Sequence, residues 1–443
     1  MRHFDVVVVG TGVTGQSAAY DCAKAGLCTA IVDRRDYGGT CALRGCDPKR
    51  VLLGAADAVD AVRRLEGNGP SGDERIDWAA LQRFKRTFTD PAPQQIESGL
   101  VAAGVATLHG TARFTAPGRL EVDGEAVDAD HIVVASGARP RPLGFPGQDL
   151  VTTSEGFMAL ESLPARLVFI GGGYISVEFA HLAAVAGARV TIVHRGRRLL
   201  EGFDEDLVRV LCDAYRAEGI DVVLDSPVRT VRASGGRLVV EAGDGSWECD
   251  MAVHGAGRVP DLDALGLEAG GVASGAHGIE VDGRLRSVSD PRVFACGDAA
   301  ARGLPLTPVG IRQGQLVARV LAGEAGTAWG DPVTPSVVYA DPPLAMVGLT
   351  EQGAKAAGLD VDVVFDDTTG WYQSRRVGVR ASAAKTLVER GSGRIVGAHV
   401  LGPAAEELIN VIAVAMAAGS PASAVTALPL TYPTAASALP YLL

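Results

Sequence analysis

Two cysteines that lie close together in the sequence are suited to redox chemistry. Cys41 and Cys46 belong to the segment GGTCALRGCDPKR, and none of the other cysteines has so close a partner. At the start of a helix with a distorted first turn, such a pair can form a disulfide, and the helix N-terminus lowers the pKa of a thiol. The alternatives are two unpaired core thiols or a metal site, which would need more Cys or His ligands nearby. We therefore favour a redox-active pair and predict no metal site.

A nucleotide-binding unit precedes the pair and would position it. An apolar β-branched run at 4–9 leads into Gly10, Gly12 and Gly15, an alanine-rich helix and a strand that ends at Asp33. This order predicts strand, glycine turn, helix and strand. The first glycine permits a tight turn, the second lets a pyrophosphate approach the backbone, and the third lets helix and strand pack closely.

The same unit occurs a second time. The strand RLVFI leads into the glycines at 171–173, followed by YISVEFAHLAAVAG and ARVTIVH. Asp33 lies 23 residues after Gly10, and His194 lies 23 residues after Gly171, so the two positions should be equivalent. The carboxylate would accept hydrogen bonds from a ribose diol and would repel a 2'-phosphate. A cationic cluster suited to a phosphate starts at the second position and continues with the arginines Arg195, Arg197 and Arg198.

The second site is therefore predicted to prefer NADPH over NADH, although the arginines could also form a solvated turn. Two dinucleotide sites and no phosphate-transfer loop favour electron transfer between two redox cofactors.

Composition excludes several other classes of function. At roughly 100–200 residues per domain, 443 residues predict two to four domains. With 41 basic and 52 acidic side chains the net charge is -11, which argues against nucleic acid and anionic membranes as partners. The chain shows neither a signal peptide nor an uninterrupted apolar run of about 20 residues. Seven cysteines are too few for a disulfide framework, so we predict a reducing, cytoplasmic location.

The motifs together resemble the pyridine nucleotide-disulfide oxidoreductases, which include glutathione, mycothione and mercuric reductases and dihydrolipoamide dehydrogenase. GGTCALRGCDPK is similar to the GGTCxxxGCxP redox segment of that family, and ASGARP to its ATGxxP strand end. GGGYISVE resembles the nicotinamide-site motif, AGRVPD the GRxPN segment, and VFACGDAA the second FAD segment. The similarity extends over nearly the whole chain.

The resemblance implies roles for single residues. Cys46 would lie against the flavin as the charge-transfer thiolate, and Cys41 would attack the substrate. Lys49, or Arg50 in a register shifted by one, would pair with Glu178 near the flavin.

Other residues would contact the cofactors themselves. Tyr174 would cover the nicotinamide pocket, Asp298 would bind the ribityl chain, and backbone near Thr307 would face the flavin. Arg195 would bind the 2'-phosphate, whereas Glu201 replaces a second arginine. The residues predicted to bind FAD or NADPH are Gly10, Gly12, Gly15, Asp33, Gly39, Thr40, Ser136, Gly137, Gly171, Gly173, Tyr174, Ser176, His194, Arg195, Arg197, Gly257, Arg258, Gly297, Asp298 and Thr307.

The C-terminal segment departs from the family pattern. Members that act on thiols carry HPTxxE, whereas this chain reads YPTAAS, with Tyr432 in place of the histidine and Ser437 in place of the glutamate. A phenol, with a pKa of about 10, is a poor base compared with an imidazole at about 6.5. We therefore disfavour glutathione and dihydrolipoamide as substrates. The last residues, SALPYLL, also lack the cysteine pair of mercuric reductase.

The predicted function is transfer of electrons from NADPH through FAD and the Cys41/Cys46 disulfide to an unidentified small acceptor, with a disulfide favoured and Tyr432 as proton donor. The alternatives are a quinone, dye or metal-ion reductase that uses the flavin or dithiol directly, and a redox sensor without catalysis.

The predicted fold is α/β, with two Rossmann-like domains and a C-terminal α+β dimerisation domain. Residues 1–145 and 265–330 would bind FAD, residues 146–264 would bind NADPH, and residues 331–443 would form a homodimer interface. By resemblance, the YPT loop would complete the active site of the partner subunit.

Overall fold

The computed structural model describes residues 2–443, which divide into two compact units. The first contains the chain up to Val51 together with Arg83–Arg141 and Arg258–Asp331. The second contains Leu52–Gln82, Pro142–Gly257 and Pro332–Leu443. Residues 52–82, which we assigned to the FAD domain, thus group with the second unit. The division into four segments stays a prediction.

A mostly parallel sheet forms the centre of the first unit. Its parallel strands follow the order β3-β2-β1-β6, with β18 paired to the other edge of β6, and an antiparallel hairpin of β4 and β5 extends the sheet beside the start of β6. Val6–Val9 are buried on both faces, which is typical of parallel strands covered on two sides. The strands are β1 (Arg2–Val9), β2 (Thr29–Asp33), β3 (Ala106–His109), β4 (Ala112–Ala116), β5 (Arg119–Val122), β6 (Glu125–Val134) and β18 (Val293–Ala295).

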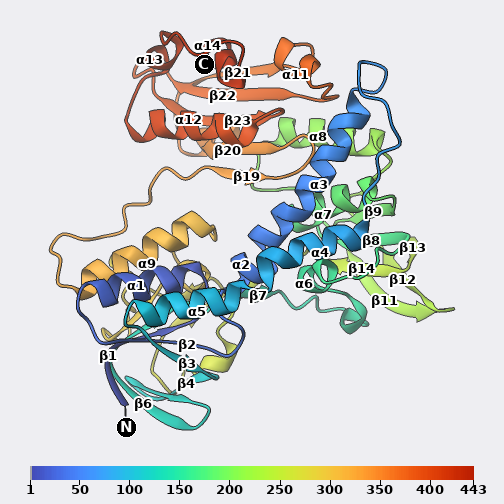
Figure 1. The fold of residues 1–443 in the computed structure, drawn as a ribbon. Coiled ribbons are helices and arrows are strands. Elements are labelled where there is room, and N and C mark those ends of the chain that lie inside the picture. Colours follow the sequence, from blue (N-terminus) through green and yellow to red (C-terminus); the bar gives the residue numbers. More distant parts are fainter. Residues whose placement is uncertain (1) are drawn as a thin grey trace. The chain divides into compact units, whose positions relative to one another are not determined.

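Three helices cover one face of this sheet. Figure 1 shows α1 (Val13–Lys24), α5 (Ala92–Ala102) and α9 (Thr307–Leu321) as a layer over β1, β2 and β3. Glycines let α1 and α9 approach closely, because a Cβ at Gly314 would lie 2.5 Å from the carbonyl oxygen of Thr14. This packing brings the start of α9 to the first glycine turn. The short helix α2 (Gly39–Arg44), the 3₁₀ helix η3 (Gly297–Ala299) and the pair β7 (Ala138–Pro140) and β15 (Arg258–Pro260) complete this part of the unit.

The second unit repeats the parallel arrangement. Its strands follow the order β10-β9-β8-β14. Helix α7 is buried at nearly every position, as expected for a helix that is apolar all round. The elements are α3 (Cys46–Arg64, shared with the first unit), α6 (Ser154–Met158), β8 (Arg166–Ile170), α7 (Tyr174–Val185), β9 (Arg189–Val193), α8 (Glu205–Ala217), β10 (Asp221–Val223), the meander β11 (Val228–Ser234), β12 (Arg237–Ala242) and β13 (Gly245–Cys249), and β14 (Met251–His254). Helix α4 (Trp78–Thr89) is divided between the two units.

The C-terminal part of the second unit is an antiparallel sheet of order β19-β20-β23-β22-β21 with helix α12 packed on β20 and β23 (Figure 1). The outer side of α12 exposes Val411 and Val414. The elements are β19 (Ser336–Val338), β20 (Leu344–Gly348), α10 (Glu351–Ala356), β21 (Val361–Asp367), α11 (Tyr372–Arg376), β22 (Ala383–Glu389), β23 (Ile395–Leu401), α12 (Ala405–Ala417), α13 (Ala422–Thr426), η4 (Ala435–Ala438) and α14 (Leu439–Leu442). The α/β fold class predicted from the sequence is confirmed.

Within residues 2–443, no helix combines the length and apolar character that crossing a membrane requires.

Candidate active site

The first glycine turn has the geometry that dinucleotide binding needs. Gly10 has φ +107°, and a Cβ there would lie 2.4 Å from the carbonyl oxygen of Ala135. A Cβ at Gly15, in the first turn of α1, would lie 1.9 Å from the carbonyl oxygen of Gly10, so this position needs a glycine for the helix to approach the strand. Asp33 ends β2 beside this turn, and its carboxylate accepts hydrogen bonds from the amide and hydroxyl of Thr11.

The turn also contacts the segment that carries the cysteines. Gly39 has φ +65°, and a Cβ there would lie 2.4 Å from the Cα of Gly12. The amide of Gly38 donates a hydrogen bond to the hydroxyl of Thr11. Gly39 therefore lets α2 start in contact with the first glycine turn, and Cys41 lies in the first turn of this helix.

The two cysteines lie on separate helices, which differs from the single distorted helix that we predicted. Five residues along a regular helix advance about 7.5 Å and turn by about 140°, so a continuous helix would hold the two sulfurs apart. Instead α2 ends at Arg44, Gly45 adopts φ -148° and ψ -112°, and α3 starts at Cys46. The break at Gly45 folds the chain so that both sulfurs reach one hydroxyl.

That hydroxyl belongs to Thr307, the first residue of α9. The Sγ of Cys41 lies 3.4 Å from its Oγ1, and the Sγ of Cys46 lies 3.6 Å from the same atom. We predicted only that backbone near this residue would face the flavin. Nothing in the sequence connects Thr307 with the cysteines, because the contact depends on the close packing of α1 and α9.

The two thiols differ strongly in acidity. A hydrogen bond from Cys41 is the largest cause that lowers the pKa of Cys46, to about 6, and the hydroxyl of Thr307 and the charge of Lys49 lower it further against the effect of burial. The same hydrogen bond and burial raise the pKa of Cys41. In the dithiol form, Cys46 therefore carries the negative charge and Cys41 carries the proton.

This asymmetry predicts how the reduced enzyme reacts with an alkylating agent. Above a pH of about 6 Cys46 is a thiolate, so its alkylation should fall about tenfold for each pH unit below that value. Thr307→Val removes one hydroxyl that stabilises the thiolate and should move the midpoint upward. Mass spectrometry of the peptide that contains Cys46 measures the reaction, with Thr87→Val on α4 as the matched control. Identical midpoints in the two variants would contradict the assigned role of Thr307.

Several groups in the first unit fit the predicted FAD site. The buried Oγ of Ser136 has no hydrogen-bond partner within the part of the chain that the structure describes. Burial raises the pKa of the Asp298 carboxyl on η3, against the opposing charge of Arg258, whose guanidinium donates to the carbonyl oxygen of Ala138. Such a carboxyl is suited to hydroxyl partners, so the residues fit the ribityl chain that the resemblance implies.

The structure also describes the backbone at other residues predicted to bind FAD. Gly137 has φ +73° and its carbonyl oxygen accepts from the amide of Asp261, while Gly297 has φ +65° and its amide donates to Gln313. Thr40 lies in α2 beside Cys41, and Gly257 adjoins the start of β15.

The second glycine turn repeats the geometry of the first in the second unit. Gly171 has φ +113°, and a Cβ there would lie 2.4 Å from the carbonyl oxygen of Gly255. Gly173 adopts extended backbone as the N-cap of α7. Ser176 replaces the third glycine, and the close approach is provided by Gly255, where a Cβ would lie 1.9 Å from the Oγ of Ser176. That oxygen is buried and has no hydrogen-bond partner among residues 2–443.

The groups after β9 differ in their fitness for a 2'-phosphate. Burial lowers the pKa of His194, so the imidazole is neutral at pH 7 and adds no charge to the predicted cationic cluster. Arg198 donates hydrogen bonds to the carbonyl oxygens of Phe203 and Glu201 and therefore holds the turn. Arg195 and Arg197 are exposed and supply the positive charge.

The predicted partners Lys49 and Glu178 lie in different units, and their pairing stays a prediction. Lys49 lies in the first turn of α3, near enough to lower the pKa of Cys46. Glu178 is buried in α7, where its Oε1 accepts a hydrogen bond from the amide of Tyr339 at 2.9 Å. Tyr174 is half exposed at the start of the same helix.

The YPT loop lies in the second unit and presents its tyrosine to solvent. The Tyr432 side chain is 75% exposed. Ser437 donates a hydrogen bond to the carbonyl oxygen of Thr434, and the Nε2 of Gln373 donates to both residues. Ser437 therefore holds the loop together and offers no carboxylate at the position of the family's glutamate.

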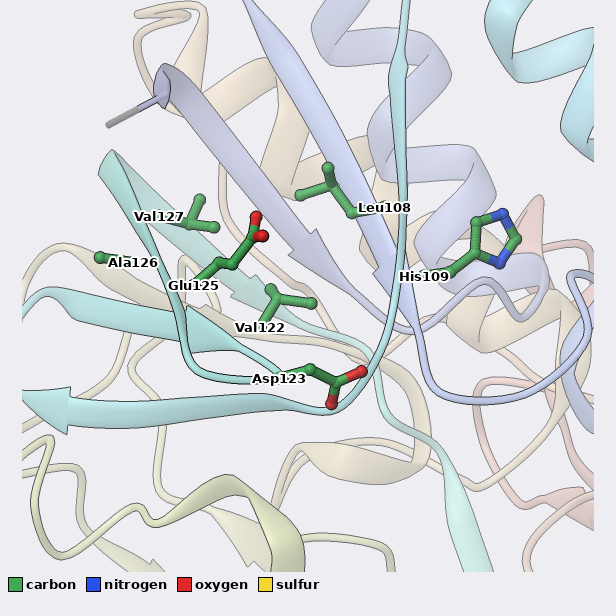
Figure 2. Close-up of a pocket in the computed structure, with 7 residues that line it drawn as sticks. All are labelled: Leu108, His109, Val122, Asp123, Glu125, Ala126 and Val127. Carbon is green, nitrogen blue, oxygen red and sulfur yellow. The ribbon is translucent and has the colours of Figure 1, made fainter.

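A pocket of about 600 Å³ opens elsewhere in the first unit, at β3, β5 and β6 (Figure 2). Two of its polar groups already have partners, since the Oδ1 of Asp123 accepts from the amide of Thr111 and the Nε2 of His109 lies 2.7 Å from Glu97. None of the predicted site residues lines it, so we assign it no function. Its lining residues are Leu108, His109, Val122, Asp123, Glu125, Ala126 and Val127.

Comparison with known proteins connects both units to one family. The family model described as pyridine nucleotide-disulphide oxidoreductase matches residues 4–314, and that of its dimerisation domain matches residues 334–442. Glutathione reductase of Burkholderia cepacia is 34% identical over 94% of this chain and 93% of its own length. Dihydrolipoyl dehydrogenase of Thermus scotoductus is 31% identical over 96% of this chain and 93% of its own.

A solved structure shares the fold over the full length. It is the Cu(II) complex of the HOCl-induced flavoprotein disulfide reductase RclA from Escherichia coli, with a TM-score of 0.91 and 27% identity over 100% of this chain and 99% of that chain.

Proposed function

The chain belongs to the pyridine nucleotide-disulphide oxidoreductase family, and we propose that it uses NADPH to reduce a small disulfide by way of FAD and the Cys41/Cys46 pair. That it is an FAD-dependent oxidoreductase follows from the family. The choice of acceptor, the preference for NADPH and the role of Tyr432 are the proposal.

The convergence of both sulfurs on Thr307 carries this proposal. The two thiols share one hydroxyl at the start of α9 and differ in acidity, which a pair of inert core thiols would not require. When bound, FAD would accept a hydride from the nicotinamide and pass an electron pair to the disulfide.

The protein residues then carry out thiol–disulfide exchange. Cys41 loses its proton, for which the hydrogen-bonded thiolate of Cys46 is the nearest acceptor, and attacks one sulfur of the acceptor. This forms a mixed disulfide and releases one thiolate. Cys46 passes the proton that it accepted to the released thiolate and then attacks the sulfur of Cys41, which restores the internal disulfide and releases the second thiolate. The second thiolate needs a proton from another source, and we assign Tyr432 to deliver it.

We assign the nucleotide preference to Arg195 and Arg197. Both are exposed after β9, whereas Arg198 is occupied by backbone carbonyl oxygens. Glu201 opposes this preference, because its negative charge would repel a 2'-phosphate. Its carboxylate lies 3.6 Å from the Nε2 of His194, at the position predicted to face that phosphate. Glutathione reductase and dihydrolipoyl dehydrogenase are both among the relatives, so the preference needs a direct measurement.

A homodimer is part of the proposal, because a dimerisation domain model matches residues 334–442 and the outer side of α12 exposes valines. We place the YPT loop at the active site of the partner subunit. The cytoplasmic location stays a prediction.

Metal-ion reduction is a second candidate. RclA was solved as a Cu(II) complex, and a dithiol that reduces two Cu(II) to two Cu(I) forms a disulfide and needs no proton donor for a leaving thiolate. This route would make the replacement of the family's histidine by Tyr432 harmless.

An anaerobic titration with NADPH tests the proposed electron path. The flavin and the disulfide should together take up about four electrons per chain, and a Cys41→Ser/Cys46→Ser variant should take up about two. NADPH should reduce the flavin about 10- to 100-fold faster than NADH at low concentration, since a charged hydrogen bond to the phosphate contributes about 1.5–3 kcal/mol. Equal uptake by the two proteins would contradict a redox disulfide.

Arg195→Ser should remove most of this preference, whereas Arg209→Ser on α8 is the matched control. A faster reaction with NADH in the unmodified enzyme would contradict the assignment of the arginines.

A further inference from the structure

Three potential metal ligands from distant parts of the sequence meet inside the second unit. Asp60 lies on α3, His181 on α7 and Asp341 in the loop between β19 and β20. One ligand atom of each residue lies within 4.8 Å of the other two. The His181 side chain is 1% exposed, and the carboxylates of Asp60 and Asp341 are 15% and 13% exposed. An imidazole and two carboxylates thus share one nearly closed space.

The histidine faces this group in an ion-pair contact with Asp60. Its Nε2 lies 3.1 Å from the Oδ2 of Asp60, yet neither ring nitrogen makes a hydrogen bond of acceptable geometry within residues 2–443. A ring nitrogen and a carboxylate oxygen that lie close together without hydrogen-bond geometry between them suit a shared metal ion. In a tetrahedral zinc site with bonds of about 2.0–2.2 Å, neighbouring ligand atoms lie about 3.3 Å apart.

A carboxylate lies near the second ring nitrogen of His181. The Oε2 of Glu218 is 4.0 Å from the Nδ1, which is beyond hydrogen-bond distance but within reach of a side-chain adjustment when a metal binds. Histidine ligands usually donate this second N–H to a carboxylate, which fixes the tautomer and the ring orientation. The ring of Tyr215 stacks on the imidazole with 6.4 Å between centroids.

Arg64 pairs with Asp341 and balances part of the negative charge. This pair does not block a metal, because one carboxylate can serve an arginine with one oxygen and a metal with the other.

We propose that Asp60, His181 and Asp341 bind one divalent transition-metal cation, for which Zn²⁺ is the reference ion. One imidazole and two carboxylates suit such an ion, and three protein ligands leave a fourth position for water. The sequence did not indicate this site, because 121 and 160 residues separate successive ligands.

A metal at this site would connect helix α7, which carries Glu178, to the loop whose Tyr339 amide donates a hydrogen bond to Glu178. His181 lies one helical turn after Glu178 on α7, and Asp341 lies two residues after Tyr339, whose amide donates to Glu178. A metal that joins α7 to this loop would fix the carboxylate. The inference does not depend on the identity of the electron acceptor.

Zinc titration of the FAD-loaded enzyme tests the site. The titration uses metal-free protein with Cys41→Ser/Cys46→Ser, so that the redox dithiol cannot bind zinc, and a competing chromophoric chelator reports the affinity. We expect one tightly bound Zn²⁺ per chain. His181→Gln should weaken binding by more than about 100-fold, and Glu218→Gln by about 10- to 100-fold, as is usual for a carboxylate behind a histidine ligand.

The chain offers a matched control in the group of His3, Asp5 and Asp130, in which His3 and Asp130 are exposed and Asp5 is half-buried. His3→Gln should leave the tight binding unchanged. X-ray absorption of the bound zinc should show only nitrogen and oxygen ligands, including one imidazole. Asp60→Asn provides a second variant if His181→Gln does not fold with bound flavin. Absence of tight binding, sulfur ligands, or binding that survives both ligand substitutions would overturn the proposal and leave the cluster as a network of ion pairs.

Discussion

Replacing Cys41 by serine is expected to lower the reduction of a disulfide acceptor by more than about 10³-fold while NADPH still reduces the flavin. A serine hydroxyl cannot form the mixed disulfide through which exchange proceeds, so the loss should be that of removing a nucleophile. Steady-state NADPH consumption with a panel of oxidised low-molecular-weight disulfides measures the loss, and anaerobic bleaching of the flavin measures the step that remains.

The same variant separates the proposed function from its rivals. Cys28→Ser is the matched control, because Cys28 is an exposed thiol in the same unit and has no other cysteine as close in sequence as Cys41 and Cys46 are to each other. Quinone or dye reduction that persists in Cys41→Ser would indicate direct transfer from the flavin. If Cu(II) reduction is lost and every disulfide is inert even with the unmodified enzyme, the dithiol serves metal ions. Retained disulfide turnover would exclude Cys41 as the attacking sulfur.

Tyr432→Phe should lower disulfide turnover by about 10²-fold or more if its phenol protonates the leaving thiolate, since general acid catalysis contributes about 10²- to 10⁴-fold. The substitution keeps the ring and removes only the hydroxyl. The effect should fall on kcat, because the proton is needed after the acceptor has bound. Measurements of kcat and KM with the best disulfide from the panel, over a range of pH, test this expectation.

Tyr441→Phe is the matched control, because Tyr441 lies in the same C-terminal segment and is also 75% exposed. Tyr432→His restores the residue type of the family at this position and should raise turnover near neutral pH, where an imidazole both gives and accepts protons. Unchanged turnover in Tyr432→Phe would show that water or another group supplies the proton, and would favour an acceptor that needs none.

Much of the fold could be predicted from the sequence because its signals are local. The glycine turns at Gly10 and Gly171 each follow a strand and precede a helix, and in the structure each adopts the positive φ that the motif requires. The equal spacing to Asp33 and His194 predicted equivalent positions, and in the structure Asp33 ends β2 and His194 directly follows β9, each an inner strand of a parallel sheet. Such patterns depend on residues a few positions apart, which backbone geometry alone brings together.

The parts of the site that the sequence did not indicate depend on packing between distant segments. The contact of Thr307 with the sulfurs arises from the approach of α9 to α1 at Gly310 and Gly314. The occupation of Arg198 by backbone carbonyl oxygens and the burial that keeps His194 neutral also arise in the folded unit. The break between α2 and α3 at Gly45 is a local feature. The glycine in ALRGC indicates that the helix is distorted near the cysteines, but the sequence does not show at which residue one helix ends and the next begins.

The contact between Gly39 and Gly12 limits how the redox segment could be transplanted. If GGTCALRGC is grafted onto another flavoprotein, the recipient glycine loop needs a glycine at the position equivalent to Gly12, so that the backbone of Gly39 can approach it. The residue before that glycine needs a hydroxyl group, as Thr11 has, to accept the hydrogen bond from the amide of Gly38. The redox segment and the glycine loop would therefore have to be transferred together, because neither adopts this backbone arrangement without the other.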